Sequence, residues 1–271
     1  MKVPKAGAIA AVIGIALTAS ACGGDDERGT ISIGIKFDQP GVGMREPDGT
    51  FTGFDVDVAT YIAKELGYKR DQIVFKQVLS NDRELLIEYN EVQLVAASYS
   101  INEKRKQKVD FAGPYFLAHQ DLMVRANDAT ITKAEDLNNA DKRLCSVTGS
   151  TSAENVRKNL APKASLLELG GYSECLVALK EGLVDAMTTD NSILAGYTVR
   201  KGNEDKFRLI GLSLSDEHYG IGMKKGSTEL QVKTNNAIRK MVEDGSWEAA
   251  VKKNFGPDYK YEPAQAITSG S

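Results

Sequence analysis

Short apolar segments rich in β-branched residues alternate with helical patterns along most of this chain. The first apolar runs have strand length and lie at 31–37, 73–78 and 94–97. Amphipathic stretches at 54–66 and 82–89 separate them, and Gly67 is a stop signal for the first helix. Because strands that are joined through helices run parallel, this βαβαβ order predicts an α/β unit with a helix-covered parallel sheet.

A second unit with the same alternation follows. We expect its strands at 121–125, 144–147, 164–167, 186–187 and 207–212. We expect its helices at 151–160, 173–180 and 192–200. The pattern of the first unit then returns as a strand and turn at 219–226 and helices at 229–243 and 247–254. The pattern therefore predicts two α/β units.

The N-terminus has the features of an export signal. Two lysines precede a run of small and apolar residues, 6–21, that is too short and alanine-rich for a persuasive transmembrane helix. We interpret 1–21 as a signal peptide. The segment Ala19-Ser20-Ala21-Cys22 resembles a lipoprotein cleavage box, with Ala19 where leucine is usual. Acyl chains on Cys22, palmitate among them, would then anchor the chain to the extracytoplasmic face of the cell membrane. The alternative is an ordinary signal peptide with an unmodified cysteine.

Composition and charge exclude several classes of protein. The formal net charge is −3 and becomes more negative when Lys2 and Lys5 are removed, which argues against a nucleic-acid partner. Residues 22–29 are predicted to be a flexible tether and 262–271 a disordered tail.

Export to an oxidising compartment favours a disulfide between the remaining cysteines, Cys145 and Cys175. Two buried free thiols are the alternative. Only His119 and His218 could add imidazole ligands, and neither lies at zinc spacing, so we expect no metal and no cofactor.

One arginine follows a short hydroxyl-rich segment at the end of an apolar run. Ser98, Tyr99 and Ser100 lead to a turn that carries Arg105. A guanidinium can hold a carboxylate through two parallel hydrogen bonds, and the serines can supply neighbouring polar contacts. A solvated surface charge is the alternative, because three lysines lie on the same turn: Lys104, Lys106 and Lys108.

Two segments of the second unit offer complementary groups. Ser150 and Thr151 begin a helix after a strand, where free N–H groups and the helix dipole favour an anion. Ordinary N-capping by these side chains is the alternative. Asp190 precedes the helix expected at 192–200, which it could simply cap.

These segments, together with Gly53-Phe54-Asp55-Val56-Asp57, resemble the polar amino-acid-binding proteins of extracytoplasmic solute-binding family 3, which serve ABC importers. Glutamate-type binders are the most similar group. The resemblance implies an α/β, bilobed type II periplasmic-binding-protein fold whose two lobes are joined by a two-strand hinge. The crossings are expected near 117–121 and 211–216. The implied division is lobe 1 at 30–118, lobe 2 at 119–213, and a C-terminal return to lobe 1 at 214–261.

The resemblance also implies roles for individual residues. Arg105 would hold the ligand carboxylate and Asp190 its ammonium. The Ser98 carbonyl and Ser100 hydroxyl would add contacts from lobe 1, and Ser150 and Thr151 from lobe 2. The acids at 55 and 57 are assigned to architecture, with Asp55 as a helix cap. A second ligand carboxylate would need a cation, for which Lys36 and Arg45 are candidates. The remaining candidates for the pocket wall are Phe37, for which core packing is the alternative, and Tyr99, Thr189 and Tyr219.

The expected function is capture of a free amino acid, glutamate first, and its delivery to a permease. No Gly-Lys-Ser/Thr phosphate loop is present, so ATP hydrolysis would belong to a separate ATPase subunit. We expect a monomer that is not an enzyme. The alternatives are a dehydratase of cyclohexadienyl or arogenate-type acids on the same fold and a ligand-sensing lipoprotein without a transporter.

Overall fold

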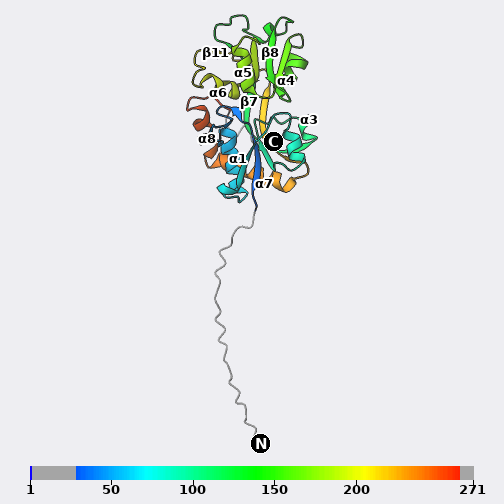
Figure 1. Ribbon diagram of the computed structural model, residues 1–271, viewed down its shortest axis with the longest axis vertical. Coiled ribbons are helices and arrows are strands. Elements are labelled where there is room, and N and C mark those ends of the chain that lie inside the picture. The colour runs from blue at the N-terminus through cyan, green and yellow to red at the C-terminus, as the bar shows by residue number, and fades with distance from the viewer. Residues whose placement is uncertain (2–28, 263–271) are drawn as a thin grey trace.

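The computed structural model describes Met1 and residues 29–262. It contains two α/β lobes, one above the other in Figure 1. The predictions for the signal peptide, for Cys22 and for the tail from 263 lie outside the described residues. Within the described part of the chain, no helix combines the length and the apolar character needed to cross a membrane.

The first lobe is built on a sheet whose parallel part was predicted. β1 (Ile31–Ile35) pairs in parallel with β5 (Ile73–Gln77) and β6 (Leu94–Ala96). On one face lie α1 (Phe54–Glu65), α7 (Thr228–Glu243) and α8 (Ser246–Phe255), whose apolar side chains share a core with Ile33 and Ile35. On the other face α2 (Arg83–Glu88) packs through Ile87. A small antiparallel sheet of β2 (Asp38–Gln39), β3 (Gly43–Arg45) and β4 (Phe51–Thr52) completes the lobe.

The second lobe repeats the layered arrangement. β8 (Arg143–Val147) pairs in parallel with β9 (Ser165–Leu169) and β10 (Ala186–Asp190). α5 (Tyr172–Lys180) and α6 (Asn191–Thr198) share one core with this sheet. The second lobe has another apolar core. It is covered by α4 (Thr151–Asn155), which continues as a π-helical turn over 156–160, and by the short helix Ala134–Leu137. The predicted disulfide is present and joins Cys145 of β8 to Cys175 of α5.

Two chain segments connect the lobes. β7 (Val109–Arg125) is one strand of 17 residues, pairing with β12 (Asp216–Lys224) in the first lobe and with β10 and β11 (Phe207–Leu209) in the second. Our prediction placed a strand only from Asp121, and it was wrong about the start. The first half of β7 is a strand because it pairs with β12, about a hundred residues later in the chain. The return crossing follows β11, where the Asp121 carboxylate accepts the N–H groups of Gly211 and Leu212.

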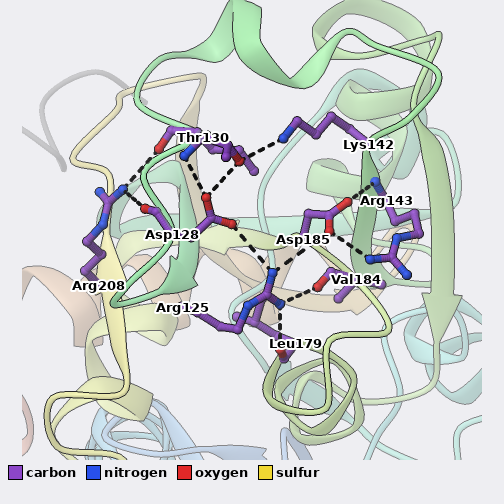
Figure 2. Close-up of polar contacts among 10 residues, drawn as sticks. Arg125, Asp128, Thr130, Lys142, Arg143, Leu179, Val184, Asp185 and Arg208 are labelled. Carbon is purple, nitrogen blue, oxygen red and sulfur yellow. Dashed lines mark hydrogen bonds and ion pairs between the residues drawn. The ribbon is translucent and has the colours of Figure 1, made fainter.

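A polar network fixes the loops of the second lobe (Figure 2). The guanidinium of Arg125, at the end of β7, donates to the carbonyls of Leu179 and Val184. It also lies 3.5 Å from the Asp128 carboxylate and 3.9 Å from that of Asp185. The network therefore joins the end of β7 to the turn after α5 and anchors the crossing strand inside the lobe.

Candidate binding site

A small cavity, partly open to solvent, lies between the lobes. The first lobe lines it with Ser80, Arg83, Ser98, Ser100 and Arg105, and the second with Ser150, Thr151, Tyr172, Asp190 and Ile193. The structure thus brings together, from opposite lobes, the predicted residues Arg105, Ser98, Ser100, Ser150, Thr151 and Asp190. Sites for small ligands occur preferentially at such an interface between two lobes.

Arg105 is held in place by its own turn. The Asn102 side chain caps α3 (Glu103–Lys106) by accepting from the Arg105 N–H at 2.9 Å. The guanidinium donates to the Ser100 carbonyl at 2.7 Å and, across the lobes, to the Gly149 carbonyl at 3.1 Å. Its side chain is buried, with Nε 3.7 Å from the Glu84 carboxylate. Arg105 is therefore not a solvated charge, although its lysine-rich neighbours are exposed.

A second buried guanidinium, which our sequence analysis missed, lies beside it. Arg83 begins α2 and donates to the carbonyls of Ser80, at 3.1 Å, and Ala97, at 3.0 Å. Its guanidinium carbon lies 4.2 Å from the centre of the Tyr99 ring, and that of Arg105 lies 5.0 Å from the same centre. Burial and the neighbouring charge of Arg105 lower the pKa of Arg83 to about 10. Two cations beside one cavity favour an anionic occupant.

A sequence signal for Arg83 existed. Ser80 and Arg83 follow β5, and the carboxyl ends of parallel strands meet at the edge where ligands bind in open α/β sheets. Ser98 and Ser100 follow β6 at that same edge.

Asp190 supplies negative charge from the second lobe. It stands at the N-cap position of α6 but makes no side-chain cap hydrogen bond, so the capping alternative does not account for it. Its carboxylate accepts the Tyr219 hydroxyl at 2.5 Å. Burial and the nearby charge of Glu217 raise the pKa of Asp190 to about 8. Among the described residues no cation lies within ion-pair distance of its carboxylate, although the charges of Arg105 and Arg83 act on it from across the cavity.

Ser98 is fixed by a buried carboxylate of α1. Asp55 accepts the Ser98 N–H at 2.7 Å and the Tyr115 hydroxyl at 2.6 Å. Ser98 has a φ of 41°, a left-handed conformation that a non-glycine residue adopts at a cost. Burial raises the pKa of Asp55 to about 6. Asp55 therefore serves the architecture, as expected, but it holds Ser98 and does not cap α1, where no side-chain cap forms.

The hydroxyls of the second lobe are engaged within the protein. The Ser150 Oγ accepts from the Ala153 N–H at 3.0 Å, which is the capping alternative that we considered. The Thr151 hydroxyl donates to Glu217 at 2.7 Å. These side chains line the cavity, but the Thr151 hydroxyl proton is already committed to Glu217.

The other predicted residues lie around the cavity and not in its wall. Lys36 is fully buried behind it, with Nζ 3.3 Å from the Ser80 hydroxyl, and burial lowers its pKa to about 8. Phe37 is half-buried beside Lys36, and Tyr99 and Thr189 are buried. Arg45 is exposed at the end of β3, along which burial decreases from Gly43 through Met44 to Arg45. The structure therefore does not bring Arg45 to the cavity.

His119 also lies outside the cavity wall. Its Nδ1 is 2.9 Å from the Asp216 carboxylate, on the paired crossing strands. No histidine is among the residues that line the cavity.

The model of the bacterial extracellular solute-binding proteins, family 3, matches residues 31–257. The chain belongs to this family. The glutamate-binding protein GluB of Corynebacterium efficiens is 41% identical to this solute-binding protein, over 93% of this chain and 91% of the relative. GluB of Corynebacterium glutamicum is 42% identical, over 92% and 88%. The structure of an ancestral arginine-binding protein bound to arginine superposes with a TM-score of 0.78 at 34% identity, covering 84% of this chain and 99% of that one. The predicted family and the bilobed α/β fold are confirmed.

Proposed function

We propose that this solute-binding protein captures glutamate outside the cytoplasm and delivers it to an ABC importer. The observation that carries the proposal is the charge pattern of the cavity. Two buried guanidiniums, Arg83 and Arg105, line the same cavity as one buried carboxyl group, Asp190, with which neither forms an ion pair. Glutamate has the complementary pattern of two carboxylates and one ammonium. The names of the two GluB relatives support the same ligand.

We assign the α-carboxylate to Arg105 and the ammonium to Asp190, so that one amino acid is held from both lobes. We assign the Ser98 carbonyl to the ammonium and the Ser100 hydroxyl to both the ammonium and the carboxylate. We assign the side-chain carboxylate to Arg83 and the Ser80 hydroxyl, which has Lys36 behind it at 3.3 Å. Paired charges in a desolvated cavity then supply the affinity. A ligand that lacks one of these charges would leave a buried charge of the protein unpaired, and this cost supplies the selectivity.

Binding and closure are coupled in this assignment. A ligand that binds the first lobe gains the contacts of Asp190 only when the second lobe comes over it. The ligand therefore stabilises the closed form by the difference between these contact sets. The importer, with its own permease and ATPase subunits, would recognise the closed form.

The position of the protein in the cell is part of the proposal. We propose that residues 1–21 are removed and that acylated Cys22 anchors a monomer to the extracytoplasmic face of the membrane. We also retain the division of the chain at 118/119 and 213/214, close to where β7 and the segment before β12 pass between the lobes.

A thermal-shift panel of glutamate, aspartate, glutamine, arginine and histidine tests the ligand. Glutamate at a hundredfold excess over its Kd should stabilise the folded protein by about 2.7 kcal/mol. A larger response to glutamine or arginine than to glutamate would replace the ligand but keep the class. Turnover of a cyclohexadienyl acid by the purified protein would replace the function itself.

A further inference from the structure

The lobes also meet outside the cavity, along the small sheet of the first lobe. Asp38 of β2 is buried, and its Oδ2 accepts from the N–H of Ser173 at 3.0 Å and from the hydroxyl of the same residue at 3.3 Å. Ser173 lies in the first turn of α5 in the second lobe. The Tyr197 hydroxyl of α6 donates to the Asp38 carbonyl. None of these three residues lines the cavity.

Two glycines allow this close approach. A Cβ atom at Gly171 would lie 2.5 Å from the Asp38 Oδ2, and one at Gly196 would lie 1.9 Å from the Pro40 carbonyl oxygen. Both distances are too short for any side chain. Val42, two residues beyond Pro40, packs in the apolar core of the second lobe. The surfaces are therefore shaped for contact when the lobes are closed.

The balance of the contact suits a reversible interaction. A carboxylate at the N-terminus of the nine-residue helix α5 gains charge-assisted hydrogen bonds and a favourable helix dipole. Against this, the Asp38 Oδ1 is buried with no hydrogen-bond partner among the described residues. The cost of burying this oxygen without a hydrogen bond offsets part of the gain, so the contact favours closure without preventing opening.

We propose that Asp38 and the first turn of α5 form a closure latch that sets ligand affinity without touching the ligand. The latch rests on the proposed function in one respect, namely that ligand binding and lobe closure are coupled. A ligand can leave only after the lobes open, so loss of the latch accelerates dissociation. Association through the open form stays unchanged, because the latch is broken in that form.

The test compares Asp38→Ala with Asp48→Ala in the full chain. Asp48 is an exposed aspartate of the same segment and bonds only to Thr50 within the first lobe, so it is a matched control. Stopped-flow displacement of glutamate should show about tenfold faster dissociation for Asp38→Ala and no change for the control. Asp38→Asn keeps an amide oxygen that can accept from Ser173, so it should show a smaller increase.

Two further measurements separate a latch from a structural role and from the ligand assignment. If Asp38 forms a latch, Asp38→Ala leaves the unfolding midpoint of the first lobe unchanged. If Asp38 has a merely structural role, the substitution lowers this midpoint and leaves the dissociation rate of glutamate unaltered, and this second result overturns the latch. Small-angle scattering of the ligand-free proteins needs no amino acid and should give a larger radius of gyration for Asp38→Ala than for Asp48→Ala. If the wild-type protein binds no amino acid, the proposed function fails and this scattering comparison alone decides the latch, with equal radii rejecting it.

Discussion

At the residue scale, the protonation of Asp190 is linked to the charge of the ligand that the cavity would take. Its pKa is raised to about 8, mainly by burial and then by the charge of Glu217. Near neutral pH the folded protein therefore carries a proton there that an ordinary aspartate would have lost. An ammonium group can take the place of that proton, so ligand binding and proton release are linked.

This linkage predicts a pH dependence of affinity. Below pH 8 the ammonium must displace a proton from Asp190, so glutamate affinity should rise as the pH goes from 6 to 7.5, by up to about tenfold per pH unit. Calorimetry in buffers of different ionisation enthalpy measures both the affinity and the released proton. A flat profile without proton release would contradict the assignment of Asp190 to the ammonium.

Asp190→Asn should weaken glutamate binding and remove a pH dependence from the stability of the ligand-free protein. The variant lacks the negative charge, so glutamate affinity should fall by about 3–5 kcal/mol. In the ligand-free protein, the raised pKa means that the folded state binds more protons than the unfolded state up to pH 8. Stability therefore falls as the pH rises through this window, and the variant should lose that slope between pH 6 and 7.5, above the pKa of Asp55. Urea unfolding at both pH values measures it.

Substitutions of Arg105 and of Arg83 should affect the selectivity between glutamate and glutamine differently. Arg105→Ala should weaken glutamate and glutamine alike, by about 3–5 kcal/mol, because both ligands have an α-carboxylate. Arg83→Gln should weaken glutamate more than glutamine, since only glutamate has a charged side chain. Arg83→Lys keeps the positive charge, so it controls for the loss of the hydrogen bonds that Arg83 donates to carbonyl groups. Equal losses for both ligands in Arg83→Gln would remove Arg83 from the side-chain pocket.

At the scale of elements, the helices were predictable and the longest strand was not. The stripe of α1, with Ile62 and Ala63 on its buried face, is a local pattern, and its stop at Gly67 is local too. The first half of β7 has no comparable local pattern, and its pairing partner is β12. Helical periodicity depends on residues three or four apart, whereas a ladder depends on a distant segment.

The disulfide is the cross-link of the second lobe, and its reduction should act on that lobe. Cys145 and Cys175 are separated by 30 positions. The chain-entropy estimate for such a loop is about 3–4 kcal/mol. Thermal unfolding with and without reductant, on wild type and on Cys145→Ser/Cys175→Ser, measures the loss. Equal midpoints in all samples would show that the buried contacts between β8 and α5 suffice.

At the scale of the whole molecule, the site exists only because the chain passes between the lobes and returns. Ser98 and Arg105 precede β7, and Asp190 lies in the lobe that β7 enters. Tyr219, which donates a hydrogen bond to Asp190, lies on the returning β12. Closing the lobes places these groups around one cavity. Any change that alters closure therefore changes affinity, even far from the ligand.

The proposed anchor is also a property of the whole molecule. Cys22→Ala should release the protein from the membrane fraction into the soluble extracytoplasmic fraction while glutamate binding is unchanged, because Cys22 is not among the residues that line the cavity. Fractionation of cells with an antibody against the folded domain measures this. Continued membrane association of the variant would point to another means of attachment.

The sequence by itself indicated the alternation of strands and helices through apolar periodicity, which is a local signal, and the disulfide through the two remaining cysteines of an exported chain. It indicated six residues that reach the cavity through their resemblance to a known family. Only the tertiary structure decided that Arg83 joins the cavity, that Arg45 is exposed, and that Asp38 meets Ser173. These outcomes depend on which distant segments share one interface. Burial and charge at such an interface are set by neighbours in space, which spacing along the chain does not specify.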